Sequence, residues 1–128
     1  MGPGDRMARA KLSLLLSSWL LTSQVSAGKA DVLQAEIERE ADGHFTIAAT
    51  VRHTDTGWGH YADRWEVMGP QGEILGKRVL WHPHEHEQPF TRNLSGIFIQ
   101  PTYTWVKIRA HDSKHGYGGR EVTLSVPH

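Results

Sequence analysis

Residues 42–53 read DGHFTIAATVRH, and this stretch decides the fold. The dipeptide DG is typical of a tight hairpin turn, because both residue types tolerate a positive φ. Behind it, apolar residues alternate with polar ones as far as Val51, and this period of two predicts a strand with one buried face. His53 continues the same alternation. We therefore expect its side chain to point inward at the rim of the domain.

The rest of the chain after residue 27 shows six similar segments and no long stretch of helical period. Turn sequences such as GPQG separate them. The expected strands cover about 33–37, 45–51, 61–68, 74–81, 90–99, 104–110 and 122–126. About seven short strands in about 100 residues predict an all-β fold, namely an immunoglobulin-like antiparallel β-sandwich. An open barrel is the alternative.

The N-terminal segment has the pattern of an export signal. Three basic residues precede the apolar run LSLLLSSWLL, and VSA at 25–27 supplies the small residues of a signal-peptidase site. We predict a signal peptide over residues 1–27, cleavage before Gly28, and one sandwich domain over residues 28–128, located in the periplasm or outside the cell. A retained membrane anchor is the alternative, although the apolar run is short for a membrane span.

Composition excludes several classes of protein. The whole chain has 14 basic and 14 acidic residues, and residues 1–27 hold three and one of them, which leaves 11 against 13. This net charge of −2, without a basic stripe, makes nucleic acid and a membrane surface unexpected partners after signal cleavage. The chain has no cysteine, so disulfides, thiolate ligands and cysteine nucleophiles are excluded.

The histidines are distributed unevenly over the expected connections. Antiparallel strands joined in succession place alternate connections at the same end of a domain. The connections after the second, fourth and sixth expected strands contain seven of the nine histidines, whereas His44 and His128 fall at the other end. The seven are His53, His60, His82, His84, His86, His111 and His115. The strand order thus predicts one histidine-rich end.

Residues 81–90, WHPHEHEQPF, add a spacing typical of metal sites. In an extended chain, His82 and His84 project from one side about 6.5–7 Å apart at the backbone, and both can lean onto one ion. Histidines from neighbouring loops would complete the shell, and neutral imidazole suits zinc, copper, nickel and iron. We predict a transition-metal site among the seven histidines, with copper or zinc favoured and iron as a further candidate. Replacing His82 and His84 together should then abolish stoichiometric binding.

Two of these residues have alternative interpretations. His53 on an inward face is also compatible with a hydrogen-bonded core residue. Asp63 shares a face with Trp65 in the expected strand, where a carboxylate is costly unless paired. It is therefore expected to accept a hydrogen bond from a ligating imidazole. Alternatively, strand pairing begins only at Arg64.

Residues 53–67, HTDTGWGHYADRWEV, and 111–119, HDSKHGYGG, resemble superoxide reductase of the desulfoferrodoxin type. That family is an immunoglobulin-like sandwich whose iron is held by histidines and a cysteine, and the thiosulfate-oxidation sulfur-carrier sandwich is similar around the first segment. The resemblance covers about half of the chain. It implies that His53, His60 and His115 are ligands, and it places His111 near the position of the axial cysteine. This chain has no thiolate there, and WHPHEHEQPF has no counterpart in that family.

The segment HPHEHEQPFTR at 82–92 is similar to small exported bacterial immunoglobulin-like domains without an assigned function. The sequence as a whole favours a metal-binding module for delivery, buffering or redox chemistry. The alternative is a structural or protein-interaction module with pH-responsive histidines, whose partner is another exported protein. A metal-dependent redox enzyme, such as one like superoxide reductase, is a third hypothesis, and no catalytic residue is assigned.

Overall fold

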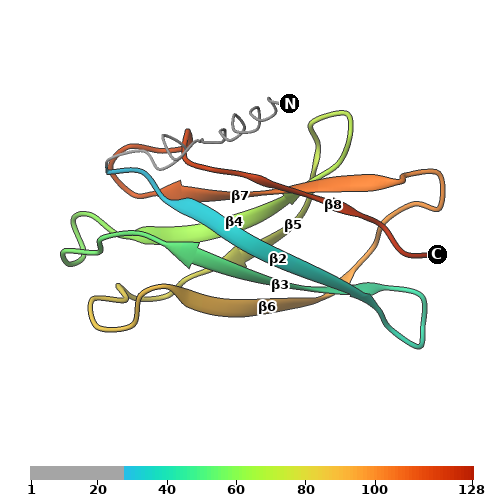
Figure 1. Ribbon diagram of the computed structural model, residues 1–128, viewed down its shortest axis with the longest axis horizontal. Coiled ribbons are helices and arrows are strands. Elements are labelled where there is room, and N and C mark those ends of the chain that lie inside the picture. Colours follow the sequence, from blue (N-terminus) through green and yellow to red (C-terminus); the bar gives the residue numbers. More distant parts are fainter. Residues whose placement is uncertain (1–27) are drawn as a thin grey trace, which may run out of the picture.

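A computed structural model of the protein describes residues 28–128. The predicted signal peptide lies outside the described residues. The described part has seven strands and no helix (Figure 1), so the all-β prediction is confirmed. No helix in residues 28–128 is therefore long and apolar enough to cross a membrane. The strands are β2 (Asp31–Arg39), β3 (Phe45–Arg52), β4 (Ala62–Met68), β5 (Ile74–Val79), β6 (Phe90–Ile97), β7 (Trp105–Asp112) and β8 (Val122–Ser125).

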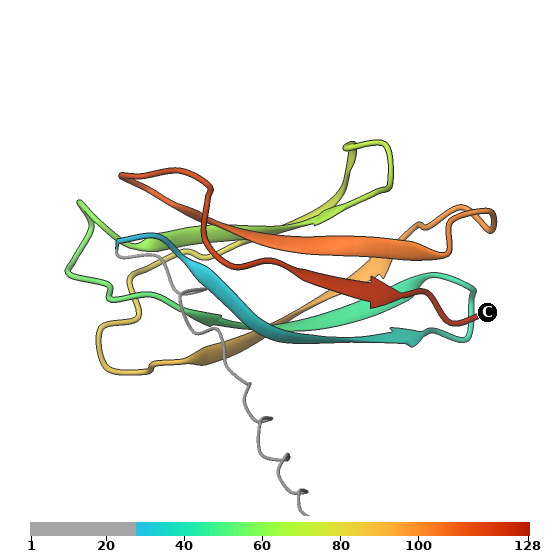
Figure 2. The same ribbon diagram turned by 45° about the horizontal axis from the view of Figure 1, so that its top comes forward.

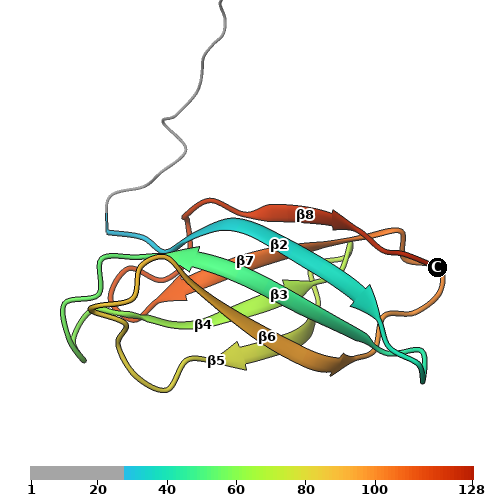
Figure 3. The same cartoon turned by 60° about the horizontal axis from the view of Figure 1, so that its bottom comes forward.

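The strands form two antiparallel sheets that face each other, as Figures 2 and 3 show. One sheet has the order β2-β3-β6 and the other has the order β5-β4-β7-β8. The chain crosses between the sheets after β3, β5 and β6. This arrangement confirms the immunoglobulin-like sandwich and excludes the open barrel.

The core lies between the inward faces of the two sheets. Along β3, every second residue from Phe45 to Val51 is buried, as the alternation predicts. The apolar residues of β7 from Val106 to Ala110 face them from the other sheet, and Trp65 of β4 is fully buried. Burying one large apolar side chain contributes about 1.5–3 kcal/mol, so these faces hold the sheets together.

One buried charge lies on the outer face of β4. Glu66 is only 1% exposed, and it accepts hydrogen bonds at 2.9 Å from Arg64 Nε, Arg109 Nε and the Tyr117 hydroxyl. The Arg109 guanidinium also lies 3.8 Å from the centre of the Tyr117 ring. Burial alone would raise the pKa of Glu66, but the three donors outweigh it and lower the pKa.

We expect Glu66→Gln to lower the free energy of unfolding by about 2 kcal/mol at pH 7, because charge-assisted hydrogen bonds become neutral ones. Urea unfolding would measure the change. Glu36→Gln, at an exposed position of β2, is the matched control and should change the free energy of unfolding little. Since the pKa of Glu66 is lowered in the folded state, the difference should be present above pH 4.5 and shrink in acid. Equal effects of the two substitutions would contradict this account.

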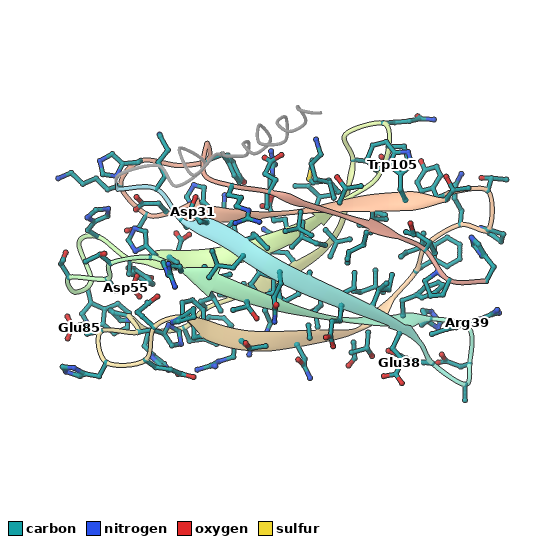
Figure 4. All side chains as sticks on the ribbon, in the orientation of Figure 1. Asp31, Glu38, Arg39, Asp55, Glu85 and Trp105 are labelled. Carbon is teal, nitrogen blue, oxygen red and sulfur yellow. The ribbon has the colours of Figure 1, made fainter. Side chains whose placement is uncertain are left out.

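The connections sort into two ends, as the strand order predicts. The β3–β4, β5–β6 and β7–β8 connections lie together at the left of Figure 1, and the other turns lie at the right. In Figure 4, Asp55 and Glu85 mark the first end, whereas Arg39 and Trp105 mark the second. The seven histidines of the sequence-based prediction therefore share one end of the sandwich.

Candidate metal centre

Two inward positions at this end carry polar side chains instead of apolar ones. His53 directly follows β3 and continues the buried series that ends at Val51, while Asp112 continues the series of β7 that ends at Ala110. The two side chains come from opposite sheets and are 1% and 0% exposed. Their closest atoms, His53 Nε2 and Asp112 Oδ2, are 3.3 Å apart. The sandwich thus buries a histidine against a carboxylate at its rim.

Two further imidazoles reach the same carboxylate oxygen from the loops. His60 Nε2 lies 2.9 Å and His115 Nδ1 lies 2.8 Å from Asp112 Oδ2. The His60 ring is centred 4.8 Å from the rings of both His53 and His115. The ligand atoms of His53, His60 and Asp112 all lie within 4.8 Å of one another. This spacing allows one ion to contact all three after small side-chain movements.

Asp55 fixes the orientation of the His53 ring. Its Oδ1 lies 2.5 Å from His53 Nδ1, and the carboxylate also accepts the backbone N–H groups of Ala62 and His84 at 3.2 and 2.6 Å. A carboxylate accepts, so Nδ1 carries a proton, and in the neutral ring Nε2 has a lone pair. That Nε2 is buried and has no hydrogen-bond partner. A carboxylate behind a histidine whose other nitrogen is free is the usual support of a metal ligand.

The electrostatics of this pair call for a positive charge. A lone pair on His53 Nε2 facing the Asp112 carboxylate is repulsive unless a proton or a metal ion lies between them. Burial lowers the pKa of His53, but Asp55 and Asp112 outweigh it and raise that pKa. The same two carboxylates that favour a proton on His53 would favour a metal cation.

The pKa of Asp112 is lowered from its usual 3.8 to about 2. Burial acts in the opposite direction, but the Lys114 N–H, at 2.9 Å from Oδ1, and the histidines at Oδ2 outweigh it. Oδ1 is therefore engaged by the backbone, and Oδ2 is left to face the histidines. The carboxylate stays charged at any pH at which a metal would bind.

The lowered pKa leads to a prediction about acid unfolding of the metal-free protein. Asp112 should contribute about 2 kcal/mol to the free energy of unfolding above pH 4, and this contribution should disappear as the pH falls toward 2. Urea unfolding at several pH values would measure it. Asp112→Asn should flatten this part of the pH profile. An unchanged profile would show that the carboxylate has no favourable partners in the folded state.

The β5–β6 connection carries three further histidines, of which His84 lies near the cluster. The His84 ring is buried, stacks on Phe90 with the centroids 4.0 Å apart, and has no hydrogen-bond partner at either nitrogen. Burial is the largest cause of its lowered pKa. His82 lies with its ring 4.6 Å from that of His84, and His86 is exposed. The link to the cluster is Asp55, whose Oδ2 is 3.9 Å from His84 Nδ1.

His111 lies on the outer face of β7. The expected strand ended at about residue 110, but β7 continues to Asp112, so this expectation is corrected. One residue before an inward position, His111 points outward, and its Nδ1 lies 2.6 Å from Asp63 Oδ1. Asp63 falls at a break in the pairing of β4 with β7, between Ala62 and Arg64, and its side chain is 24% exposed. Asp63 thus does pair with an imidazole, on the opposite face from the cluster.

Comparison with known proteins gives one relative. The chain is 34% identical over 105 residues, 82% of its length, to a protein of Halomicrobium mukohataei named "Putative lipoprotein". It spans 51% of that relative's own length. No family model and no solved structure matches the chain. The resemblances to superoxide reductase and to the sulfur-carrier sandwich therefore stay predictions.

Proposed function

We propose that this protein is an exported β-sandwich that binds one divalent transition-metal ion through His53, His60 and Asp112, with His115 beside them. The observation that carries the proposal is the His53 side chain. Its Nδ1 is held by Asp55, and its buried Nε2 has no hydrogen-bond partner and lies 3.3 Å from Asp112 Oδ2. A neutral histidine held in this way beside a buried carboxylate is costly unless a proton or a metal ion lies between the two groups.

The donor set favours zinc or copper(II). Two imidazoles and one carboxylate match zinc sites that keep a coordination position open, and nitrogen sites bind copper(II) more tightly than zinc. Iron(II) is the third candidate, because two histidines and one carboxylate also suit it. His53 and Asp112 are buried, but the His60 and His115 side chains are 22% and 38% exposed. An ion would therefore be reached from one side, which suits delivery, buffering or redox chemistry.

Two observations support export. The relative from Halomicrobium mukohataei is named as a lipoprotein, and the first 27 residues of this chain have the pattern of a secretory signal. We propose that residues 28–128 act in the periplasm or outside the cell. A metal-binding module there has no thiols to oxidise, because the chain has no cysteine.

The test is an equilibrium titration of the exported, tag-free protein with zinc and with copper(II). We expect one ion per chain and a melting temperature that rises with metal concentration. By mass action, free metal at 100 times the Kd should raise the free energy of unfolding by about 2.7 kcal/mol. His53→Ala should abolish this binding. Replacing His82 and His84 together by alanine should leave it in place, and a loss of binding there would assign the ion to the β5–β6 connection instead. Protein that binds neither ion would overturn the proposal and favour an interaction module whose histidines bind protons and not a metal ion.

A further inference from the structure

Gly28, the residue after the predicted cleavage site, lies against two of the clustered histidines. Its carbonyl oxygen is 2.8 Å from His115 Nδ1 and 3.2 Å from His60 Nε2. The same two nitrogens approach Asp112 Oδ2. The backbone of Gly28 therefore shares the space in which the proposed ion would lie.

The start of β2 holds Gly28 at this place. Lys29 Nζ donates to the carbonyl oxygen of His115 at 3.5 Å, and Ala30 is 1% exposed. The backbone N–H of Arg120 donates to Asp31 Oδ1 at 2.7 Å. These contacts tie residues 29–31 to the β7–β8 connection, which also carries His115.

The position is also suited to glycine. Gly28 has a φ of +79°, and a Cβ added there would lie 3.0 Å from Cε1 of the His115 ring. Any other residue would be strained in the backbone and crowded against this imidazole. Glycine thus permits the backbone itself to approach the ring.

We propose that the amino terminus created by cleavage before Gly28 is a ligand of the metal ion. The inference rests on the proposed function. The amino nitrogen and the carbonyl oxygen of one residue are three covalent bonds apart, so both can bind one ion in a five-membered ring. Before cleavage, this nitrogen belongs to a planar amide and its lone pair is delocalised. Hydrolysis of the 27–28 peptide bond frees the lone pair, and removal of the signal peptide thereby switches on tight metal binding.

The experiment compares two exported proteins whose N-termini are determined by intact mass. One begins at Gly28, and the other retains the two residues Ser26 and Ala27. We expect the extension to weaken copper(II) and zinc binding at least tenfold while leaving the melting temperature of the metal-free protein unchanged. Two residues added after His128 are the matched control, since the C-terminus lies at the opposite end of the sandwich (Figure 1).

A second measurement reads the ligand itself. Copper(II)-loaded protein made with ¹⁵N-glycine should change its nitrogen hyperfine pattern in electron paramagnetic resonance, and the extended protein should not. Equal affinities with unchanged spectra, or an exported protein that begins at another residue, would overturn this inference alone. Absence of binding in both proteins would instead overturn the proposed function and the inference together.

Discussion

Asp112→Asn is expected to lower the affinity for zinc and copper(II) by about 100-fold or more, since even partners one step removed from a metal contribute 10- to 100-fold. Asp112 Oδ2 is the atom on which the nitrogens of His53, His60 and His115 converge. The amide of asparagine has nearly the same shape but no charge, so the substitution removes a ligand and the negative charge that attracts the ion. Isothermal titration of the exported protein would measure the change.

Asp63→Asn is the matched control for this experiment. Asp63 is also an aspartate paired with a histidine at the same end of the sandwich, with 2.6 Å between its Oδ1 and His111 Nδ1. It lies on the outer face, so its substitution should leave the affinity within about twofold of the parent. A loss with Asp63→Asn and none with Asp112→Asn would move the metal site to His111.

Gly119→Ala is expected to destabilise the protein by about 3 kcal/mol or more, at the upper end of the cost of overpacking. A Cβ added at Gly119 would overlap the backbone carbonyl oxygen of Ala30 and lie 3.0 Å from Asp31 Oδ1. Ala30 is buried, so its backbone can move away only if the start of β2 separates from the β7–β8 connection. Chemical denaturation would measure the loss of stability.

The same substitution should weaken metal binding, because Gly28 is held in place by this segment. Gly59→Ala is the matched control: a Cβ there would meet no atom within 4 Å, and neither glycine has a positive φ. The two variants therefore differ in available space. Similar stabilities of the two variants would show that β2 does not pack closely against the β7–β8 connection.

Much of the fold could be predicted because its strands bury one face each. Alternation from Phe45 to Val51 predicted the buried face of β3, and its continuation placed His53 inward, where the structure has it. The same rule applied to β7 would have placed Asp112 inward as well. It was missed because the expected strand ended at Ala110, where the apolar residues end, whereas backbone pairing continues to Asp112.

The loop residues of the site could be predicted less well. Strand order predicts the end at which a connection lies, but it does not specify the distances between side chains. Asp55 follows β3 in a loop that turns back so that its carboxylate reaches His53 and two backbone N–H groups, and no sequence pattern indicates this turn. His84 is buried on Phe90, whereas its spacing with His82 had indicated a ligand pair.

The exposed tryptophans illustrate the same difficulty. Trp58 and Trp81 lie next to histidine-containing segments in the sequence. Their side chains are 68% and 75% exposed, and with Tyr61 they line a hollow beside β4 and β5. A position next to a histidine-rich segment thus does not predict that a tryptophan is buried.

Anomalous diffraction from crystals of the zinc- or copper-loaded protein tests the central claim most directly. The account predicts one metal peak per chain, at roughly 2.0–2.2 Å from His53 Nε2 and from an Asp112 oxygen, with His60 in the same shell. A peak bound instead by His82, His84 or His86, or no peak near His53, would contradict it.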